Sequence, residues 1–122
     1  MNLNHGTLLV FYKTEKGQCP VAEFLNSLPA RVAQKVTWVL KLLQELDTVP
    51  SQYFKKLSAT AEIWECRMVF SGNTYRILCF FRGGNQVVLT HGFMKKTQKT
   101  PREEITKAER LRADFIRRHG RA

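Results

Sequence analysis

The chain has 122 residues, and 43% of them are hydrophobic, which suits one domain with a single core and argues against overall disorder. Its formal net charge is +10, and residues 91–122 alone carry ten Lys and Arg against four Asp and Glu. An excess of positive charge of this kind indicates a nucleic acid or an acidic protein as the partner. The alternative is a solvated helix that is kept basic for solubility. We expect residues 1–122 to form a single domain that meets a polyanion.

The cysteines, the histidines and the hydropathy pattern indicate the cellular compartment and whether a metal site is expected. The three cysteines are far apart without a CxxC pair, and the three histidines are isolated, so we expect no metal site and no cofactor. Cys66 and Cys79 lie in apolar, strand-like runs and are interpreted as small core residues. Nothing resembles a signal peptide, and no apolar run approaches membrane-spanning length, so we expect a cytoplasmic protein with reduced thiols and no membrane partner.

The N-terminal part predicts one strand and two helices. Residues 7–12 (TLLVFY) form a short β-prone run. Pro20 suits the first turn of a helix, and Pro29 restarts the chain in a second helix that ends before Pro50. Apolar residues recur at helical spacing through both, so residues 20–47 are predicted as two consecutive helices that cover one side of a sheet.

The middle of the chain predicts a loop and three strands. Residues 48–62 are predicted as a loop. Residues 63–70, 74–82 and 86–94 then alternate or run apolar, with turn signals between them, which favours an antiparallel meander with short hairpins.

A basic helix over residues 101–119 closes the chain, with Thr100 as its expected N-cap and Glu103 and Glu104 in its first turn. The element order β-α-α-β-β-β-α predicts an α+β fold with an antiparallel-rich sheet. We expect the helices to pack on one sheet face, with the two N-terminal helices there and the basic C-terminal helix closing the domain.

The most informative segment is His91–Pro101 (HGFMKKTQKTP), which places Lys95, Lys96 and Lys99 within five positions after a strand. Lysines this close repel one another, so they contribute little to the folded state alone. They are typical of proteins in which a polyanion, most often a nucleic acid, supplies the missing negative charge.

Three stretches in this order resemble one family: residues 63–67 (IWECR), 75–78 (YRIL) and 91–101, followed by a basic helix. The chain resembles the RelE/HigB-like toxins of bacterial type II toxin–antitoxin modules, in their phage-derived branch, over roughly residues 7–117. Cys66 stands where that branch usually has Leu. The resemblance implies a RelE-like fold, cleavage of mRNA on the ribosome, and neutralisation by a cognate antitoxin encoded alongside.

Metal-independent RNA cleavage uses the 2′-hydroxyl as nucleophile, and arginine suits the charge that develops on the phosphate. Strand alternation and hairpin pairing predict Arg67 and Arg76 on one open sheet face, holding the scissile phosphate. The alternative for Arg67 is a cross-strand pair with Glu65 or another acid, and for Arg76 a similar edge contact.

Lys95 and Lys96 are the candidates for general acid or base, because repulsion within a lysine cluster lowers a pKa. Alternation places them on opposite faces, and the sequence does not decide which one faces the site. His91 is a further catalytic candidate, as a general acid; its alternative is a half-buried histidine bonded to a backbone carbonyl.

Five further residues are candidates for binding RNA. Phe93 is either a core residue, the more common case, or a stacking platform for a base. The others are cations that suit backbone phosphates: Lys55, Lys56, Lys99 and Arg102. For Lys55 and Lys56 the alternative is an ordinary solvated loop pair.

Three functions remain open on the sequence. The leading hypothesis is a ribosome-dependent endoribonuclease toxin, with the ribosome, mRNA and an antitoxin as partners. The second is a ParE-like inhibitor of DNA gyrase that acts by binding alone, since proteins of that type share the fold. The third is a non-catalytic nucleic-acid-binding module. Its affinity for nucleic acid would fall steeply as the salt concentration rises.

Overall fold

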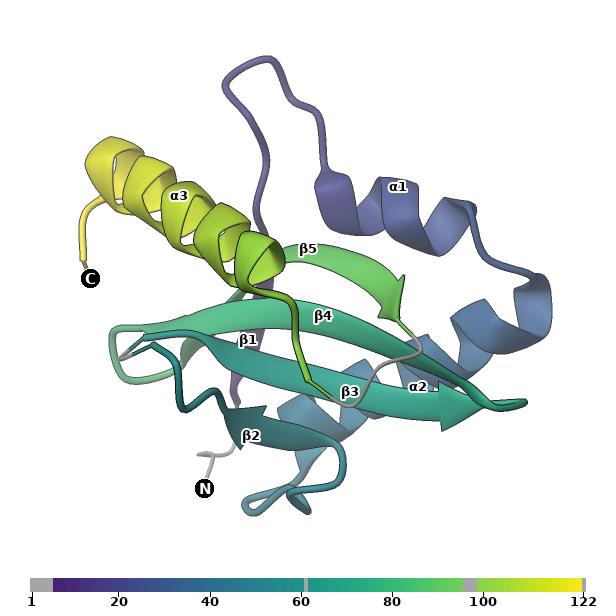
Figure 1. Cartoon of the computed structure of the whole chain (residues 1–122). Coiled ribbons are helices and arrows are strands. Elements are labelled where there is room, and N and C mark those ends of the chain that lie inside the picture. The colour runs from purple at the N-terminus through teal and green to yellow at the C-terminus, as the bar shows by residue number, and fades with distance from the viewer. Residues whose placement is uncertain (1–5, 61, 96–98, 122) are drawn as a thin grey trace.

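In the part of the chain that the structure describes, five strands form one sheet in the order β1-β5-β4-β3-β2, and three helices pack against it (Figure 1). The computed structural model describes residues 6–60, 62–95 and 99–121. Within them the strands are β1 (Leu8–Phe11), β2 (Phe54–Lys56), β3 (Trp64–Phe70), β4 (Asn73–Arg82) and β5 (Gln86–Lys95). The helices are α1 (Pro20–Asn26), α2 (Ala30–Glu45) and α3 (Arg102–His119). The predicted α+β fold is confirmed.

The sheet is antiparallel except at one edge. β2, β3, β4 and β5 pair antiparallel in turn, and β1 pairs parallel with β5. The meander of three strands is therefore confirmed, with bounds within a residue of those predicted. The register places Arg67 of β3 directly opposite Arg76 of β4, and Arg76 opposite Phe93 of β5. These three side chains lie on one sheet face, because side chains directly opposite each other in paired strands point the same way.

The prediction of a loop over residues 48–62 is wrong in its middle, where β2 pairs with the start of β3. Three residues are too few for a period-two pattern to register in the sequence. The strand forms because Phe54 is buried at 3% exposure and stacks on Trp64, with 5.0 Å between ring centroids. This pairing brings Lys55 opposite Glu65, which places Lys55 on the sheet face that carries Arg76.

The two N-terminal helices begin as the prolines predict, with Pro20 as the first residue of α1 and Pro29 as the N-cap of α2. Both pack on one sheet face and share a core with it. Cys66 and Cys79 lie in this core, as predicted, and burial raises the pKa of Cys66 to about 12. Burial also raises the pKa of Cys79, so neither thiol is poised as a nucleophile at neutral pH.

The third helix packs on the opposite face, so the expectation that all helices share one face holds for α1 and α2 only (Figure 1). Its apolar stripe of Ile105, Ala108, Leu111 and Phe115 covers Leu78 and other residues of the sheet. A meander sheet has two apolar faces, and the sequence pattern alone does not assign a helix to either. Because α3 covers only part of its face, the part with Arg67 and Arg76 is left to other segments.

A close approach between β5 and α1 fixes the position of that helix. A Cβ atom added to Gly92 would lie 2.3 Å from Cδ2 of Phe24, which is far inside contact distance. Glycine is therefore required where the Phe24 ring lies against the strand. In the described part of the chain, no helix combines the length and the apolar character that crossing a membrane needs.

Candidate functional site

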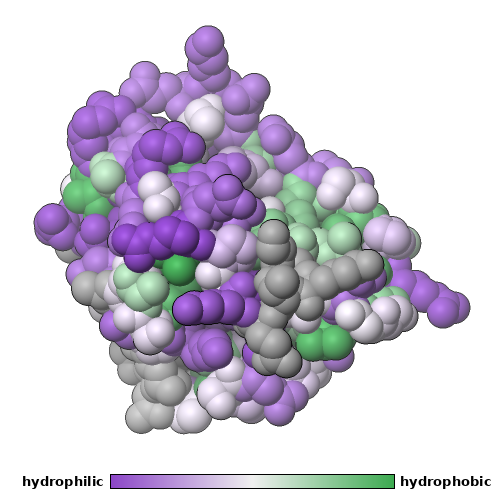
Figure 2. Space-filling model, in the orientation of Figure 1, coloured by the Kyte–Doolittle hydropathy of each residue, from purple (hydrophilic) through white to green (hydrophobic). Residues whose placement is uncertain are grey.

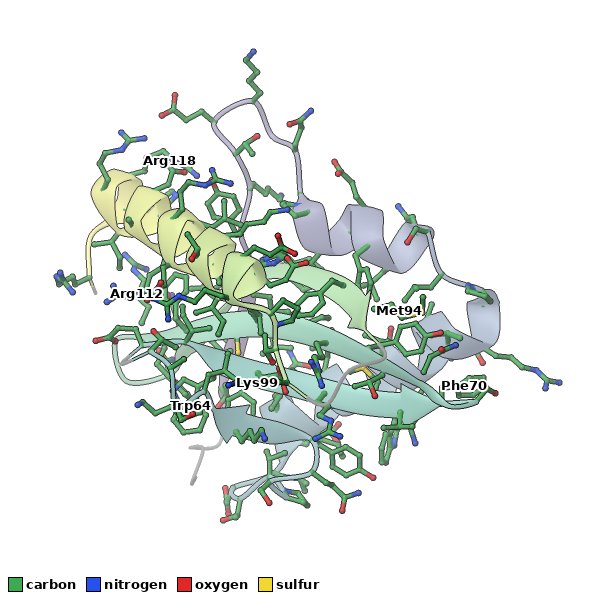
Figure 3. The ribbon with its side chains drawn as sticks, in the orientation of Figure 1. Trp64, Phe70, Met94, Lys99, Arg112 and Arg118 are labelled. Carbon is green, nitrogen blue, oxygen red and sulfur yellow. The ribbon has the colours of Figure 1, made fainter. Side chains whose placement is uncertain are left out.

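A lysine-lined groove of about 350 Å³ lies between β2, β3 and the start of α3. Lys55 and Lys56 line it from β2, and Lys99 lines it from the segment that enters α3. Figure 3 shows Lys99 in front of β3. The remaining lining residues are Leu57, Ser58, Ala59, Glu65, Thr100 and Ile105. Three cations that sequence analysis assigned separately to RNA binding are thus brought together around one cavity.

A buried ion pair lies in the wall of this groove. Nε of Arg76 is 3.6 Å from Oε2 of Glu65, and their side chains are 1% and 2% exposed. The hydroxyl of Thr100 donates a hydrogen bond to the same Oε2 of Glu65. The segment before α3 is therefore tied to β3 through one carboxylate oxygen, which Arg76 and Thr100 share.

The prediction that Arg67 and Arg76 share a sheet face is confirmed, but the prediction that both lie open is wrong for Arg76. Arg76 is buried, and its acidic neighbour is Glu65. The alternative predicted for Arg67 was a pair with Glu65 or another acid, and Glu65 pairs with Arg76 instead. Because the strand register sets Glu65 one step diagonally from Arg76, the acid reaches the buried arginine and leaves the half-buried Arg67 without a carboxylate among the described residues.

Thr100 has a different role from the one predicted. The N-cap of α3 is Pro101, and no side chain among the described residues caps the helix there. The Thr100 hydroxyl is directed to Glu65 and is not available to the first turn of the helix. Glu103 and Glu104 do lie in that first turn, where a negative charge stabilises the helix N-terminus.

His91 lies on the same sheet face, yet it does not line the groove. It is 2% exposed, and Nε2 lies 3.0 Å from Oε1 of Glu104 while Nδ1 lies 3.1 Å from Oγ1 of Thr90. Burial lowers the pKa of His91, against the opposing effect of Glu104. The alternative of a backbone carbonyl partner is therefore replaced by two side-chain partners, and the geometry fits a residue that holds α3 to β5.

The remaining predicted residues are spread around this face. Phe93 is half-buried against the α3 core and stacks on His91 with 5.9 Å between centroids, which fits its core interpretation. Lys95 ends β5 opposite Thr74. The Lys95 side chain and the whole of Lys96 lie outside the described residues. Arg102 is exposed at the first position of α3 and does not line the groove.

A larger hollow of about 770 Å³ lies at the other end of α3, against β1. Its arginines are already engaged: Arg82 donates to the carbonyls of His119 and Gly120, and Arg118 donates to Asp114. The bonds from Arg82 of β4 fasten the end of α3 to the sheet, whereas the Arg118–Asp114 contact lies within the helix. The groove of Lys55, Lys56 and Lys99 is therefore the better candidate for an anionic ligand.

The surface character agrees with this choice. The outer face of α3 is mostly hydrophilic, and the hydrophobic surface on this side gathers between α1 and the end of β5 (Figure 2). Exposed large apolar side chains include Met94, at 49%, and Val69, at 54%. The lysine groove lies away from Met94, on the β2 side of the sheet (Figure 3).

Sequence reasoning missed the role of Glu65 and Thr100 in building the groove. An acidic residue between Trp64 and Cys66 in an otherwise apolar run was the available signal, because a carboxylate buried in a sheet needs a cation or donors near it. What the sequence did not supply was the partner, since the choice between Arg67 and Arg76 depends on strand register.

The comparison with protein families decides the assignment. The profile of the family described as "Phage derived protein Gp49-like (DUF891)" matches residues 23–113, well over half of the chain. The chain belongs to the Gp49-like family. This is a family of toxins of toxin–antitoxin modules, related to RelE and ParE, and membership implies a cognate antitoxin as a partner. A search of curated proteins gave no match.

Proposed function

We propose that this Gp49-like protein is a RelE/HigB-type toxin that cuts mRNA on the ribosome and thereby stops translation. The observation that carries the proposal is the groove itself: Lys55, Lys56 and Lys99 come from two segments far apart in sequence and meet around one cavity beside Glu65. Cations gathered without equal numbers of acids suit the phosphates of a nucleic acid backbone. A gyrase inhibitor that acts by binding alone does not need a carboxylate among them.

The groove offers the groups that metal-independent cleavage requires. The lysines hold the phosphates on either side of the scissile bond and offset the charge that develops on phosphorus. Glu65 accepts the proton of the 2′-hydroxyl, whose oxygen then attacks the adjacent phosphorus. As the P–O5′ bond breaks, a lysine ammonium donates a proton to the leaving 5′-oxygen, which yields a 2′,3′-cyclic phosphate and a 5′-hydroxyl.

Arg76 then acts as a positioning residue and not as the phosphate clamp that sequence analysis expected. Buried behind Glu65, it holds the carboxylate toward the groove together with Thr100. Arg67, half-buried at the sheet edge, keeps the role of a phosphate ligand. Lys95 and Lys96 stay candidates for the proton donor, and His91 is not needed in this scheme.

The test is cleavage of a defined message in a purified translation system with and without ribosomes. We expect cuts inside translated codons that carry 2′,3′-cyclic phosphate ends, only when ribosomes are present. A Glu65→Gln protein that is shown to be folded should bind ribosomes and cut at least about a hundredfold more slowly, since general acid–base groups contribute about 10²–10⁴-fold. Intact message together with accumulated gyrase–DNA cleavage complexes would instead establish the ParE-like alternative.

The antitoxin belongs to the same proposal. Its acidic segment covers the lysine groove and excludes RNA from it, because complementary charge is the cheapest way to block a cationic site. Purified complex should therefore fail to cut message until the antitoxin is removed. Co-expression of an acidic neighbouring reading frame that restores growth is the cellular counterpart of this measurement.

A further inference from the structure

A notch interrupts the edge of the sheet where β2 begins. β2 pairs with β3 only from Trp64 to Cys66, while β3 continues to Phe70 (Figure 1). The last contact on this side is the Arg67 N–H, which donates to the carbonyl of Tyr53 at 2.8 Å. By strand alternation the N–H of Val69 points to the same edge of the sheet as the N–H of Arg67. In the described chain, no β2 residue lies opposite Val69. A cavity of about 280 Å³ fills this position.

The notch combines cations, an aromatic ring and an amide. Its lining includes Lys35, Gln52, Tyr53 and Arg67. The Nε atom of Arg67 is buried and has no hydrogen-bond partner in the described chain. This atom is shielded from solvent, so it is not itself a position that a ligand in the notch reaches. Lys35 and the half-buried Arg67 nevertheless make the lining cationic, which suits a ligand that carries negative charge.

An exposed tryptophan borders the notch. Trp38 of α2 is 45% exposed, contacts the Tyr53 ring edge-on with centroids 5.6 Å apart, and carries the Lys35 ammonium 4.8 Å above its ring. A large aromatic side chain on the solvent face of an amphipathic helix adds nothing to the core. With cations on both sides it forms the pattern that single-stranded nucleic acid sites use, in which rings stack bases and cations hold phosphates.

We propose that the notch is a base-binding subsite for single-stranded RNA, placed one nucleotide or so beyond the lysine groove. The base stacks on Trp38 against Tyr53, the Gln52 amide meets its polar edge, and its phosphate accepts from Arg67 and Lys35. Lys35 gives up its position over the Trp38 ring to the base and moves to the phosphate. This inference rests on the proposed function, because it takes the RNA of that proposal as the ligand.

The position of the notch fits a continuous strand of RNA. Glu65 lines the groove and Arg67 lines the notch, and these residues are two apart on β3, about 7 Å by the rise of a strand. On the β2 side, Lys55 of the groove and Tyr53 of the notch are also two residues apart. A chain crossing the sheet edge therefore passes from one site to the other without a gap. The substrate class is single-stranded, since a duplex would not expose a base for stacking.

The test uses Trp38 as its own reporter. In a Trp64→Phe protein, which keeps the ring stacked on Phe54, Trp38 is the one remaining tryptophan. The probe is a short single-stranded RNA with 2′-O-methyl groups, which lacks the nucleophilic hydroxyl. We expect saturable quenching of Trp38 emission. The Trp38→Leu substitution in the native background should weaken binding by about 5- to 150-fold, the range for loss of one stacked base, while Trp38→Phe retains most of the affinity.

Leu8→Ser is the matched control, because Leu8 is similarly exposed, at 51%, on the opposite edge strand. It should bind the probe as the unsubstituted protein does. If Trp38→Leu binds RNA unchanged while Lys55→Glu with Lys56→Glu abolishes binding, the notch inference fails and the proposed function stands. If Trp38→Leu loses only neutralisation by the antitoxin, the notch is a protein interface and the inference is overturned. If the unsubstituted protein leaves mRNA intact on ribosomes, both the proposed function and the notch inference fail.

Discussion

Arg76 and Glu65 form an ion pair inside the sheet face that carries the lysine groove, with Nε and Oε2 3.6 Å apart. The pair links the chemistry of the site to the stability of the fold. A buried ion pair contributes little net stability relative to well-packed apolar residues, yet removing one partner leaves an uncompensated buried charge. Its presence beside a groove is therefore explained better by the positioning of Glu65 than by any gain for the fold.

Single substitutions in this pair should destabilise the protein strongly. Arg76→Met and Glu65→Gln are each expected to lower the free energy of unfolding by about 3–5 kcal/mol, as seen when one buried partner is removed. The double variant should regain much of that loss, which a urea-unfolding cycle measures. Arg67→Met, directly opposite in the register but half-buried, should cost clearly less. Equal losses for Arg67 and Arg76 would contradict the burial assigned here.

Gly92 should not tolerate a side chain. The Cβ of Gly92→Ala meets the Phe24 ring, so either α1 or the strand shifts, and overpacking of this kind costs about 1–3 kcal/mol. Gly84→Ala is the control, because a Cβ there meets nothing within 4 Å. Thermal or urea unfolding of both proteins compares them directly. A Gly92→Ala protein as stable as Gly84→Ala would mean that Phe24 does not lie against β5.

His91 should make stability fall in mildly acidic solution. Burial lowers its pKa in the folded state, so the unfolded chain binds more protons as the pH drops below about 6.5, the ordinary histidine value. Stability is therefore complete above that pH and is lost progressively toward the lowered pKa. Glu104 opposes this effect, whereas Lys107 and Arg110 reinforce it. Urea unfolding from about pH 7.5 down to about pH 5.5, one pH unit either side of that ordinary value, should show a shallower pH dependence for His91→Gln than for the unsubstituted protein.

The lysine groove should govern the salt dependence of RNA binding. Each lysine that contacts a phosphate contributes about 0.7 to the slope of log K against log salt for a single strand. Lys55→Gln with Lys56→Gln should therefore lower the slope by about 1.4 and weaken binding at low salt. Lys41→Gln, on an exposed position of α2 paired with Glu45, is the control and should leave the slope unchanged. An unchanged slope in the variant with Lys55→Gln and Lys56→Gln would show that these lysines do not contact the phosphates of the bound RNA.

The sequence was sufficient for the parts of the fold that have strong local signals. Prolines at 20 and 29 mark the two helix starts. Turn signals at residues 71–73 and 83–85 of the sequence mark the strand ends to within a residue, although Asn73 is already the first residue of β4. The strand β2 was not predictable because it is three residues long and is held by one aromatic stack. The sheet face that α3 covers was not predictable because both faces of a meander are apolar.

For the candidate site, the sequence indicates which charged residues to consider, but it does not predict which of them lie next to one another. Lys55 and Lys56 are candidates because their charge lies next to the aromatic Phe54, and Lys99 because it belongs to the lysine cluster after the third strand; the structure adds that the three line one cavity. The burial of Arg76 was not predictable, because it depends on Glu65 from β3 and on the segment holding Thr100 crossing the same face. Distances between residues from separate segments come from tertiary packing, which a single sequence does not encode in any short pattern.

The measurement that bears most directly on the central claim is mapping of RNA 5′ ends in cells that express the toxin without its antitoxin. If the lysine groove binds and cleaves mRNA, 5′-hydroxyl ends should appear at positions inside translated codons, together with growth arrest. Both should disappear in a folded variant carrying Lys55→Ala, Lys56→Ala and Lys99→Ala, and persist in the Lys41→Gln control. Growth arrest with no new ends in translated messages, or unchanged cleavage by the triple variant, would contradict that claim.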